Sequence, residues 1–261
     1  MTLCPTPSNC QGDLAEKTLV LATDLDGTFL GGSSADRARL YDWIEANRAT
    51  VGLIFVTGRD LDFIEKLTRA EVPRPDYVVG DVGTTIAACN PGSGFAPLPT
   101  LEVEIAARWG DAGPRVREAL SGIGGLRVQP TSFRYRVSYD MDPDRFDARA
   151  YRIVDELGLD ALSSDNRFFD VLPRGISKGP TLRRLLAELG VPDRRVLVAG
   201  DTLNDLSMLN SGLPAVAVGN AEPALLEELE KAEHVHRARG EGAAGIAEAI
   251  RRFGYLSHIA A

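Results

Sequence analysis

The segment Leu19–Thr28 constrains the fold of this chain more than any other part of it. It reads Leu-Val-Leu-Ala-Thr-Asp-Leu-Asp-Gly-Thr, an apolar run that ends in two carboxylates, a glycine and a hydroxyl. If the run is a buried strand, Asp24 and Asp26 lie at its carboxyl end, where open α/β sheets bind their ligands. Like charges held this close need a positive partner, and a divalent cation is the simplest one.

The bulk composition is that of an ordinary globular protein. The 261 residues are 44% hydrophobic and 25% charged, with a formal net charge of -8. This length can bury one large core or two modest ones. The excess of acidic residues disfavours general binding to nucleic acids, which requires a basic face. It disfavours binding to anionic membrane surfaces for the same reason. No apolar run approaches the ~20 residues of a membrane span.

The amino-terminal residues and the cysteines predict a cytoplasmic protein. Residues 1–13 are rich in Thr, Pro, Ser and Asn, and we expect them to form a disordered leader without the features of a signal peptide. Cys4, Cys10 and Cys89 are odd in number and lack metal-type spacing, so we expect free thiols rather than disulfides or a zinc site.

Strand and helix signals alternate on both sides of a central interruption. Strands are predicted at 18–23, 51–56, 77–79, 195–199 and 215–218, and helices at 36–48, 60–71, 178–189, 203–209, 223–232 and 243–253. This alternation is typical of a doubly wound α/β fold with a parallel sheet. The predicted core comprises residues 14–89 and 173–261.

Residues 90–172 follow another pattern and predict an inserted α+β cap. A stretch rich in proline and glycine at 90–100 precedes helical signals at 113–121 and 144–157, and strand signals at 134–139 and 167–172. Arg134 and Arg136 alternate with apolar residues, which is the pattern of a half-exposed antiparallel strand. They could bind substrate, but a solvated strand face is the default expectation.

Four segments place reactive groups at strand ends or helix starts. They are Asp24-Leu-Asp26-Gly-Thr28, Thr57-Gly58-Arg59, Lys178-Gly179 and Gly200-Asp201-Thr-Leu-Asn204-Asp205. In a parallel sheet, the first, second and fourth share one edge. Carboxylates without a nearby His or Cys favour Mg²⁺, and a hydroxyl, a lysine and free backbone N–H groups suit a phosphoryl group. Together they indicate phosphoryl transfer.

Asp24 is then the natural nucleophile, and Asp26 a general acid and base, although spacing alone does not say which aspartate has which role. Each motif also has a purely structural explanation. Thr57 could cap a helix, Lys178 could be solvated, and Asp201 and Asp205 could be a helix cap and a surface charge. A calcium loop fits poorly, since its twelfth position would be Ala35. His234, His236 and His258 lie far from every motif, and we expect them at the surface or on an edge strand.

In their order, these segments resemble the signature of the haloacid dehalogenase superfamily of phosphohydrolases over residues 18–253. The resemblance implies a Rossmann-like core with a C2-type cap, Asp24 as nucleophile and Asp26 as acid and base. It implies phosphate binding by Thr57, Gly58, Lys178 and Asn204. It further implies Mg²⁺ held by Asp24, the backbone carbonyl of Asp26 and Asp201, with Asp205 completing the surroundings. The stretches 80–86 and 242–250 are similar to sucrose-phosphate phosphatases.

The resemblance implies a phosphoric monoester hydrolase that cleaves a phosphorylated sugar or glycoside, such as sucrose 6-phosphate, through an aspartyl-phosphate. The alternatives are a mannosyl- or glucosyl-3-phosphoglycerate phosphatase, a phosphomutase of the same superfamily, and a non-catalytic binding module. We expect the cap to close through hinges near 88–98 and 172–176. The partner is expected to be a small molecule, neither nucleic acid nor membrane, and the oligomeric state stays open.

Overall fold

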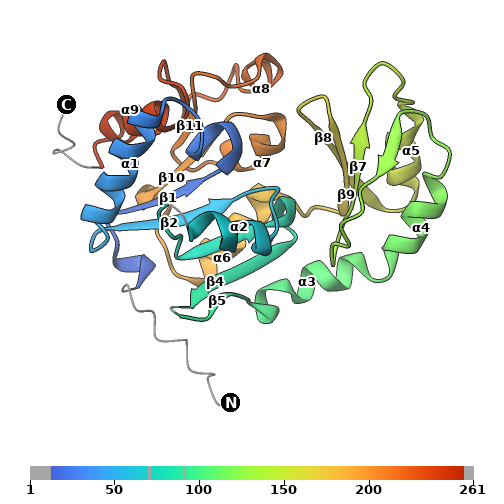
Figure 1. Ribbon diagram of the computed structural model, residues 1–261, viewed down its shortest axis with the longest axis horizontal. Coiled ribbons are helices and arrows are strands. Elements are labelled where there is room, and N and C mark those ends of the chain that lie inside the picture. The colour runs from blue at the N-terminus through green and yellow to red at the C-terminus, as the bar shows by residue number, and fades with distance from the viewer. Residues whose placement is uncertain (1–12, 70–71, 91, 256–261) are drawn as a thin grey trace.

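Two β-sheets form the framework of the protein. The computed structural model describes residues 13–69, 72–90 and 92–255. The larger sheet has the strand order β12-β11-β10-β1-β2-β3-β4-β5, and the smaller has the order β6-β7-β9-β8. The two sheets form separate bodies side by side, and helix α3 (Pro99–Trp109) runs from one to the other (Figure 1). We call residues 99–173, from α3 to the end of β9, the cap, and the remainder the core.

The core strands deliver the predicted motifs in the predicted order. They are β1 (Leu19–Thr23), β2 (Val51–Val56), β3 (Tyr77–Gly80), β4 (Thr85–Asn90), β5 (Gly94–Pro97), β10 (Val196–Gly200), β11 (Ala215–Ala217) and β12 (Val235–Arg237). The six strands from β12 to β3 run parallel to their neighbours. The predicted parallel, doubly wound α/β arrangement is therefore confirmed for this part of the sheet.

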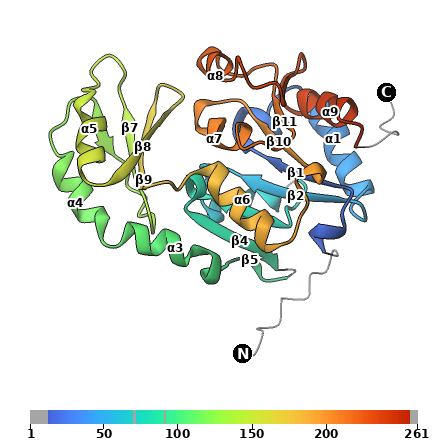
Figure 2. The ribbon, with the colours of Figure 1, turned by 180° about the vertical axis from the view of Figure 1, so that it is seen from behind.

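Both faces of the core sheet are buried, which explains its uninterrupted apolar strands. In β1, Val20 and Ala22 face one apolar cluster, while Leu19 and Leu21 face the other. One face carries α1 (Ser34–Ala46), α2 (Leu61–Thr68) and α9 (Gly242–Arg252), and the other carries α6 (Lys178–Glu188), α7 (Leu206–Leu209) and α8 (Pro223–Glu228). Figure 2 shows α6 and α7 in front of the sheet.

The antiparallel strands β4 and β5 differ from the sequence expectation. β4 pairs antiparallel with β3, and β5 pairs antiparallel with β4. Gly92 and Gly94 both have positive φ values, of 80° and 86°, which lets this proline-rich and glycine-rich stretch form a hairpin instead of a linker. The predicted cap boundary at residue 90 therefore falls inside the core sheet, and so does most of the predicted hinge at 88–98.

The cap has an apolar core of its own. Its strands are β6 (Leu126–Val128), β7 (Val137–Met141), β8 (Leu159–Ser164) and β9 (Phe168–Pro173), and its other helices are α4 (Ala112–Ala119) and α5 (Arg149–Glu156). Buried residues of these helices pack against β7 and β9. Helix α3 joins the two cores, because Ile105 packs in the core cluster and Trp109 in the cap cluster.

Two predicted cap elements begin later than expected. The helix predicted from residue 144 begins at Arg149, and the strand predicted from residue 134 begins at Val137. Residues 131–136 form no strand, since Arg134 and Arg136 instead reach across to the core.

Several smaller expectations concern the ends and the polar residues of the chain. His236 lies on the edge strand β12, as expected, with Nε2 at 2.7 Å from Oε1 of Glu248. Cys89 carries a free thiol. His258, Cys4, Cys10 and residues 1–12 of the predicted leader lie outside the described residues. Within the described residues, no helix is long and apolar enough to span a bilayer.

Candidate active site

Three adjacent parallel strands bring the predicted site residues to one sheet edge. Asp24 directly follows β1, Thr57 directly follows β2, and Asp201 directly follows β10. In the sheet register, Thr23 of β1 pairs with both Phe55 and Ala199, which aligns the three strand ends. The expectation that these segments meet along one edge is therefore confirmed.

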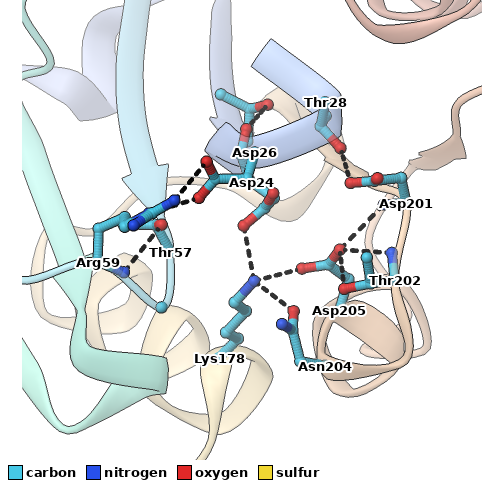
Figure 3. A network of polar contacts seen from close by, with 12 residues as sticks. Asp24, Asp26, Thr28, Thr57, Arg59, Lys178, Asp201, Thr202, Asn204 and Asp205 are labelled. Carbon is cyan, nitrogen blue, oxygen red and sulfur yellow. Dashed lines mark hydrogen bonds and ion pairs between the residues drawn. The ribbon is translucent and has the colours of Figure 1, made fainter. Parts of the chain in front are cut away.

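Lys178 lies at the centre of the site, at the start of α6. Its side chain is fully buried, and Nζ donates to Oδ1 of Asp24 at 2.7 Å, Oδ1 of Asn204 at 2.5 Å and Oδ1 of Asp205 at 2.6 Å (Figure 3). These bonds use all three ammonium donors. Burial alone would lower the pKa of Lys178, but the two aspartates outweigh it and raise that pKa. A solvated lysine is therefore excluded.

Asp205 is a buried residue that supports the site through hydrogen bonds, and it is not a surface charge. Its Oδ2 accepts the backbone N–H groups of Asp201 at 2.9 Å and Thr202 at 3.0 Å, while Oδ1 faces Lys178. It thereby forms a capping box with Thr202 at the start of the short turn Leu203–Asp205. This network fixes the loop that carries Asp201 relative to the lysine.

Asp24, Asp201 and Asp205 form a buried acidic cluster whose carboxylate oxygens lie within 4.8 Å of one another. Burial raises the pKa of Asp24 well above its ordinary value, and Asp205 and Asp201 raise it further against the opposing effect of Lys178. Burial and Asp205 also raise the pKa of Asp201, to about 7. Hard oxygen donors with this excess of negative charge fit a divalent cation such as Mg²⁺.

Asp26 lies in a tight turn, Leu25–Phe29, and points away from the acidic cluster. Its carboxylate accepts two bonds from the guanidinium of Arg59, at 2.8 and 3.0 Å, and the two side chains are 52% and 48% exposed. Arg59 in turn lies over the ring of Phe63, at 4.4 Å from its centroid. Arg59 was not among the predicted site residues; its position two residues after Thr57 was the available signal.

The turn that carries Asp26 requires a glycine at position 27. Gly27 has a φ of +79°, and a Cβ there would lie 2.1 Å from Oδ2 of Asp201. Thr28 closes the same turn, because its hydroxyl donates to Oδ1 of Asp201 at 2.5 Å. The Asp-x-Asp-Gly-Thr pattern is thus explained by contacts between two loops that are distant in the sequence.

We predict that Gly27→Ala lowers the free energy of unfolding by at least about 2 kcal/mol, because it adds backbone strain and a clash. We also expect kcat to fall about a hundredfold, since Asp201 must move aside. Gly122→Ala is the matched control, because Gly122 has the same φ of +79° with no atom within 4 Å. Thermal melts and turnover measure both effects; equal activity of the two variants would contradict the argument.

Thr57 does not cap the helix that follows it. The N-cap of α2 is Asp60, whose side chain accepts the N–H of Phe63 at 2.8 Å. Thr57 is fully buried, and its Oγ1 accepts the N–H of Arg59 at 3.2 Å. Its position at the sheet edge, beside Gly58, leaves it available for another role than helix capping.

A cavity of about 590 Å³ opens over these groups. From the core it is lined by Asp24, Asp26, Gly58, Arg59, Asn204 and others, and from the cap by Gln129, Thr131, Phe133, Arg136, Ser164, Phe168 and Asp170 among others. The cap therefore forms one wall of the chamber, and the acidic cluster lies at its other side.

The expectation of a solvated face is wrong for Arg136, whereas Arg134 is exposed as expected. Arg136 is 5% exposed and donates to Oδ1 of Asp170 at 3.1 Å and to the carbonyl of Gly58 at 2.9 Å. Arg134 makes a bidentate pair with buried Glu102, with both bonds at 2.9 Å. The alternating pattern does not reveal the burial of Arg136, because the acid that pairs with it is 34 residues away in the sequence.

Comparison with known proteins places the chain in a family. The profile of the family described as sucrose-6F-phosphate phosphohydrolase matches residues 17–254. A mannosylfructose-phosphate phosphatase from Agrobacterium fabrum is 28% identical over 246 residues, which are 90% of this chain and 96% of that protein. A glucosylglycerol-phosphate synthase from Pseudomonas anguilliseptica is 38% identical over 241 residues, but the chain spans only 31% of that longer protein.

Among solved structures, the sucrose-phosphatase from Synechocystis, in complex with sucrose and phosphate, matches with a TM-score of 0.82. The match covers 92% of this chain and all of that one, at 24% sequence identity. This likeness confirms the mixed α/β fold. From the profile match over nearly its whole length, the chain belongs to the sucrose-6F-phosphate phosphohydrolase family.

Proposed function

We propose that the protein is a Mg²⁺-dependent phosphatase that hydrolyses a phosphorylated sugar or glycoside through an aspartyl-phosphate. The observation that carries this proposal is the position of Asp24, whose Oδ1 is held by buried Lys178 while the residue borders the chamber between core and cap. A carboxylate fixed in this way presents its second oxygen to a reacting group.

In the first half of the proposed reaction, Asp24 attacks phosphorus and the bond to the sugar oxygen breaks. Asp26 supplies the proton that the leaving oxygen needs. In the second half, Asp26 accepts a proton from the attacking water, which releases inorganic phosphate and regenerates Asp24. The bidentate pair with Arg59 must open for Asp26 to exchange protons with either group.

Lys178 and the phosphate loop, which we define as Thr57, Gly58 and Arg59, would hold the transferring phosphoryl group. The lysine offers positive charge, Thr57 a hydroxyl, and the loop its backbone N–H groups; Asn204 adds an amide next to Lys178. Such fixed donors stabilise the negative charge that spreads over the equatorial oxygens.

We further propose that Mg²⁺ is held by Asp24, Asp201 and the backbone carbonyl of Asp26, with Asp205 behind them. When bound, the cation would neutralise the clustered carboxylates and polarise a phosphoryl oxygen. Because both oxygens of Asp205 already accept hydrogen bonds, we assign Asp205 to the support of Asp201 and Lys178 more than to the metal itself.

Removing divalent cations with a chelator should reduce turnover below about 1% of the Mg²⁺-loaded rate, because the acidic cluster then repels the substrate. Added Mg²⁺ should restore the rate. The melting temperature should also rise with Mg²⁺, as expected for a ligand that binds only the folded state. Asp201→Asn should reduce both the recovery of the rate and the rise in melting temperature on addition of Mg²⁺. Full activity of the enzyme in the presence of the chelator would refute the role of the cation.

The substrate is tested by a screen for phosphate release. The names of the family and of its relatives suggest three phosphate esters to compare, those of sucrose, mannosylfructose and glucosylglycerol. Mannosyl- and glucosyl-3-phosphoglycerate test the alternative substrates. Release of phosphate without a bisphosphate activator argues against a phosphomutase, and no release from any ester would favour a binding module. The cytoplasmic location expected from the sequence is part of this proposal.

A further inference from the structure

Arg136 reaches from the cap into the core at the edge of the chamber. It directly precedes β7, and its guanidinium stacks over the ring of Phe133, at 3.6 Å from the centroid. One terminal nitrogen donates to Oδ1 of Asp170 within the cap, at 3.1 Å. The other donates to the carbonyl of Gly58, at 2.9 Å. A buried side chain of the cap therefore bonds directly to the backbone of the phosphate loop.

Asp81 faces the same guanidinium from the core. Its Oδ1 lies 3.6 Å from the nitrogen of Arg136 that also contacts Gly58, and its Oδ2 accepts the hydroxyl of Thr85 at 2.6 Å. Burial raises the pKa of Asp81, and Arg136 opposes this effect. Oδ1 of Asp81 and Nε of Arg136 are buried atoms without a hydrogen bond. A buried charged pair with unused bonding capacity is sensitive to small displacements of either partner.

The backbone at Asp81 is strained and contacts the phosphate loop. Asp81 and Val82 have φ values of +52° and +59°, a conformation that a β-branched residue rarely adopts. Their N–H groups donate to the carbonyls of Arg59 at 3.1 Å and Thr57 at 3.0 Å. The strained turn thus forms hydrogen bonds to the residues before and after Gly58. The carbonyl of Gly58 itself accepts a hydrogen bond from Arg136.

The next residue connects this turn to the catalytic lysine. The carbonyl of Gly83 accepts the hydroxyl of Thr181 at 2.7 Å, and a Cβ at Gly83 would lie 2.4 Å from the backbone of Ser177. The turn Asp81–Gly83 therefore packs against the start of α6, where Lys178 lies. It contacts both parts of the proposed phosphate site, and Arg136 connects it to the cap.

We propose that Arg136 and Asp81 are positioning residues that couple the placement of the cap to the geometry of the phosphate loop. A cap displaced from the core would remove the bond between Arg136 and Gly58 and take the guanidinium of Arg136 away from Asp81, so the placement of the cap and the geometry of the loop change together. A substrate that fills the chamber and holds the cap in place would thereby also fix the loop around its phosphate. This inference rests on the proposed phosphatase function.

Arg134 provides a matched control. It lies on the same segment and pairs with Glu102 of α3 and, at 3.3 Å, with the hydroxyl of Thr85 in the core. Its contacts include no atom of the phosphate loop. Loss of Arg134 weakens the attachment of the cap, whereas loss of Arg136 additionally frees Gly58. A difference between the two variants therefore isolates the coupling.

Arg136→Met should lower kcat/KM for a sugar phosphate about a hundredfold, with most of the loss in kcat, because the loop is misplaced. Arg134→Met should lower kcat/KM by less than about a fifth of that factor. Asp81→Asn keeps the shape of the side chain but removes its charge, and it should lower kcat/KM in the same way as Arg136→Met. It replaces Arg136→Met in the test if that variant does not fold. For p-nitrophenyl phosphate, which carries no sugar for the cap to hold, the three variants should differ only a few-fold from the parent.

Hydrogen exchange tests the coupling without any turnover. Arg136→Met should speed exchange of the amides of Arg59 and Val82 more than about tenfold, and Arg134→Met should leave them unchanged. Faster exchange in a protein that releases no phosphate would support the coupling and refute the phosphatase. Unchanged exchange, with equal kinetic losses in both arginine variants of an active phosphatase, would overturn the coupling alone.

Discussion

Asp24→Asn is expected to lower kcat by at least about a thousandfold while the protein stays folded, since loss of a nucleophile removes the covalent route altogether. Asparagine keeps the shape of the side chain and still accepts a bond from Lys178. Because burial raises the pKa of Asp24, its ionised form is costly to bury, so the melting temperature should be unchanged or higher. Phosphate release and thermal melts measure the two effects.

The matched control for this variant is Asp26→Asn. With sugar phosphates it should also be severely impaired, because the leaving oxygen then lacks a proton donor. With p-nitrophenyl phosphate, whose leaving group needs no proton, the first step should survive and a phosphoryl adduct on Asp24 should accumulate and be visible by mass spectrometry. An adduct in Asp24→Asn, or turnover of that variant within tenfold of the parent, would exclude Asp24 as the nucleophile.

Lys178→Met should abolish turnover and also destabilise the fold by about 3–5 kcal/mol, the usual cost of removing one partner from a buried charged group. Methionine fills much of the same volume but leaves Asp24 and Asp205 without their cation. Asp24 would then fold best in its protonated form. Burial raises the folded-state pKa of Asp24 above its unfolded value, so the stability deficit should grow as the pH rises from 5 to 8.

The double variant Lys178→Met/Asp205→Asn separates charge from catalysis. It should recover part of the lost stability, because one unpaired buried carboxylate is gone, but it should recover no activity. Denaturant unfolding at the two pH values gives the comparison. A single variant that is as stable as the parent at pH 8 would show that Lys178 does not compensate the buried acids.

The sequence predicts the core of this protein well because its signals are local. The apolar strands that end in Asp24, Thr57 and Asp201 each carry their own evidence, and parallel pairing then places these residues together. The N-cap at Asp60 was predictable for the same reason.

The remaining features depend on contacts between distant residues. The role of Arg136 follows from Gly58 and Asp170, which are 78 and 34 residues away. The hairpin of β4 and β5 falls where the sequence predicts the start of the cap and a hinge, because proline and glycine are typical of both hinges and hairpins. The strained turn at Asp81 and Val82 contradicts local propensity, and such residues persist only where the surrounding structure imposes them.

The interrupted topology of the core sheet has a consequence for biosynthesis. Strand β1 pairs with β2, which follows it closely, but also with β10, so that Val20 lies beside Val196. Asp24 and Thr57 therefore leave the ribosome long before Lys178 and Asp201, and the sheet between them cannot close until the whole cap has been made. Such long-range pairing forms slowly and late. The catalytic pocket is thus among the last parts of the molecule to assemble, and a chain that stops short of β10 lacks Asp201, Asn204 and Asp205.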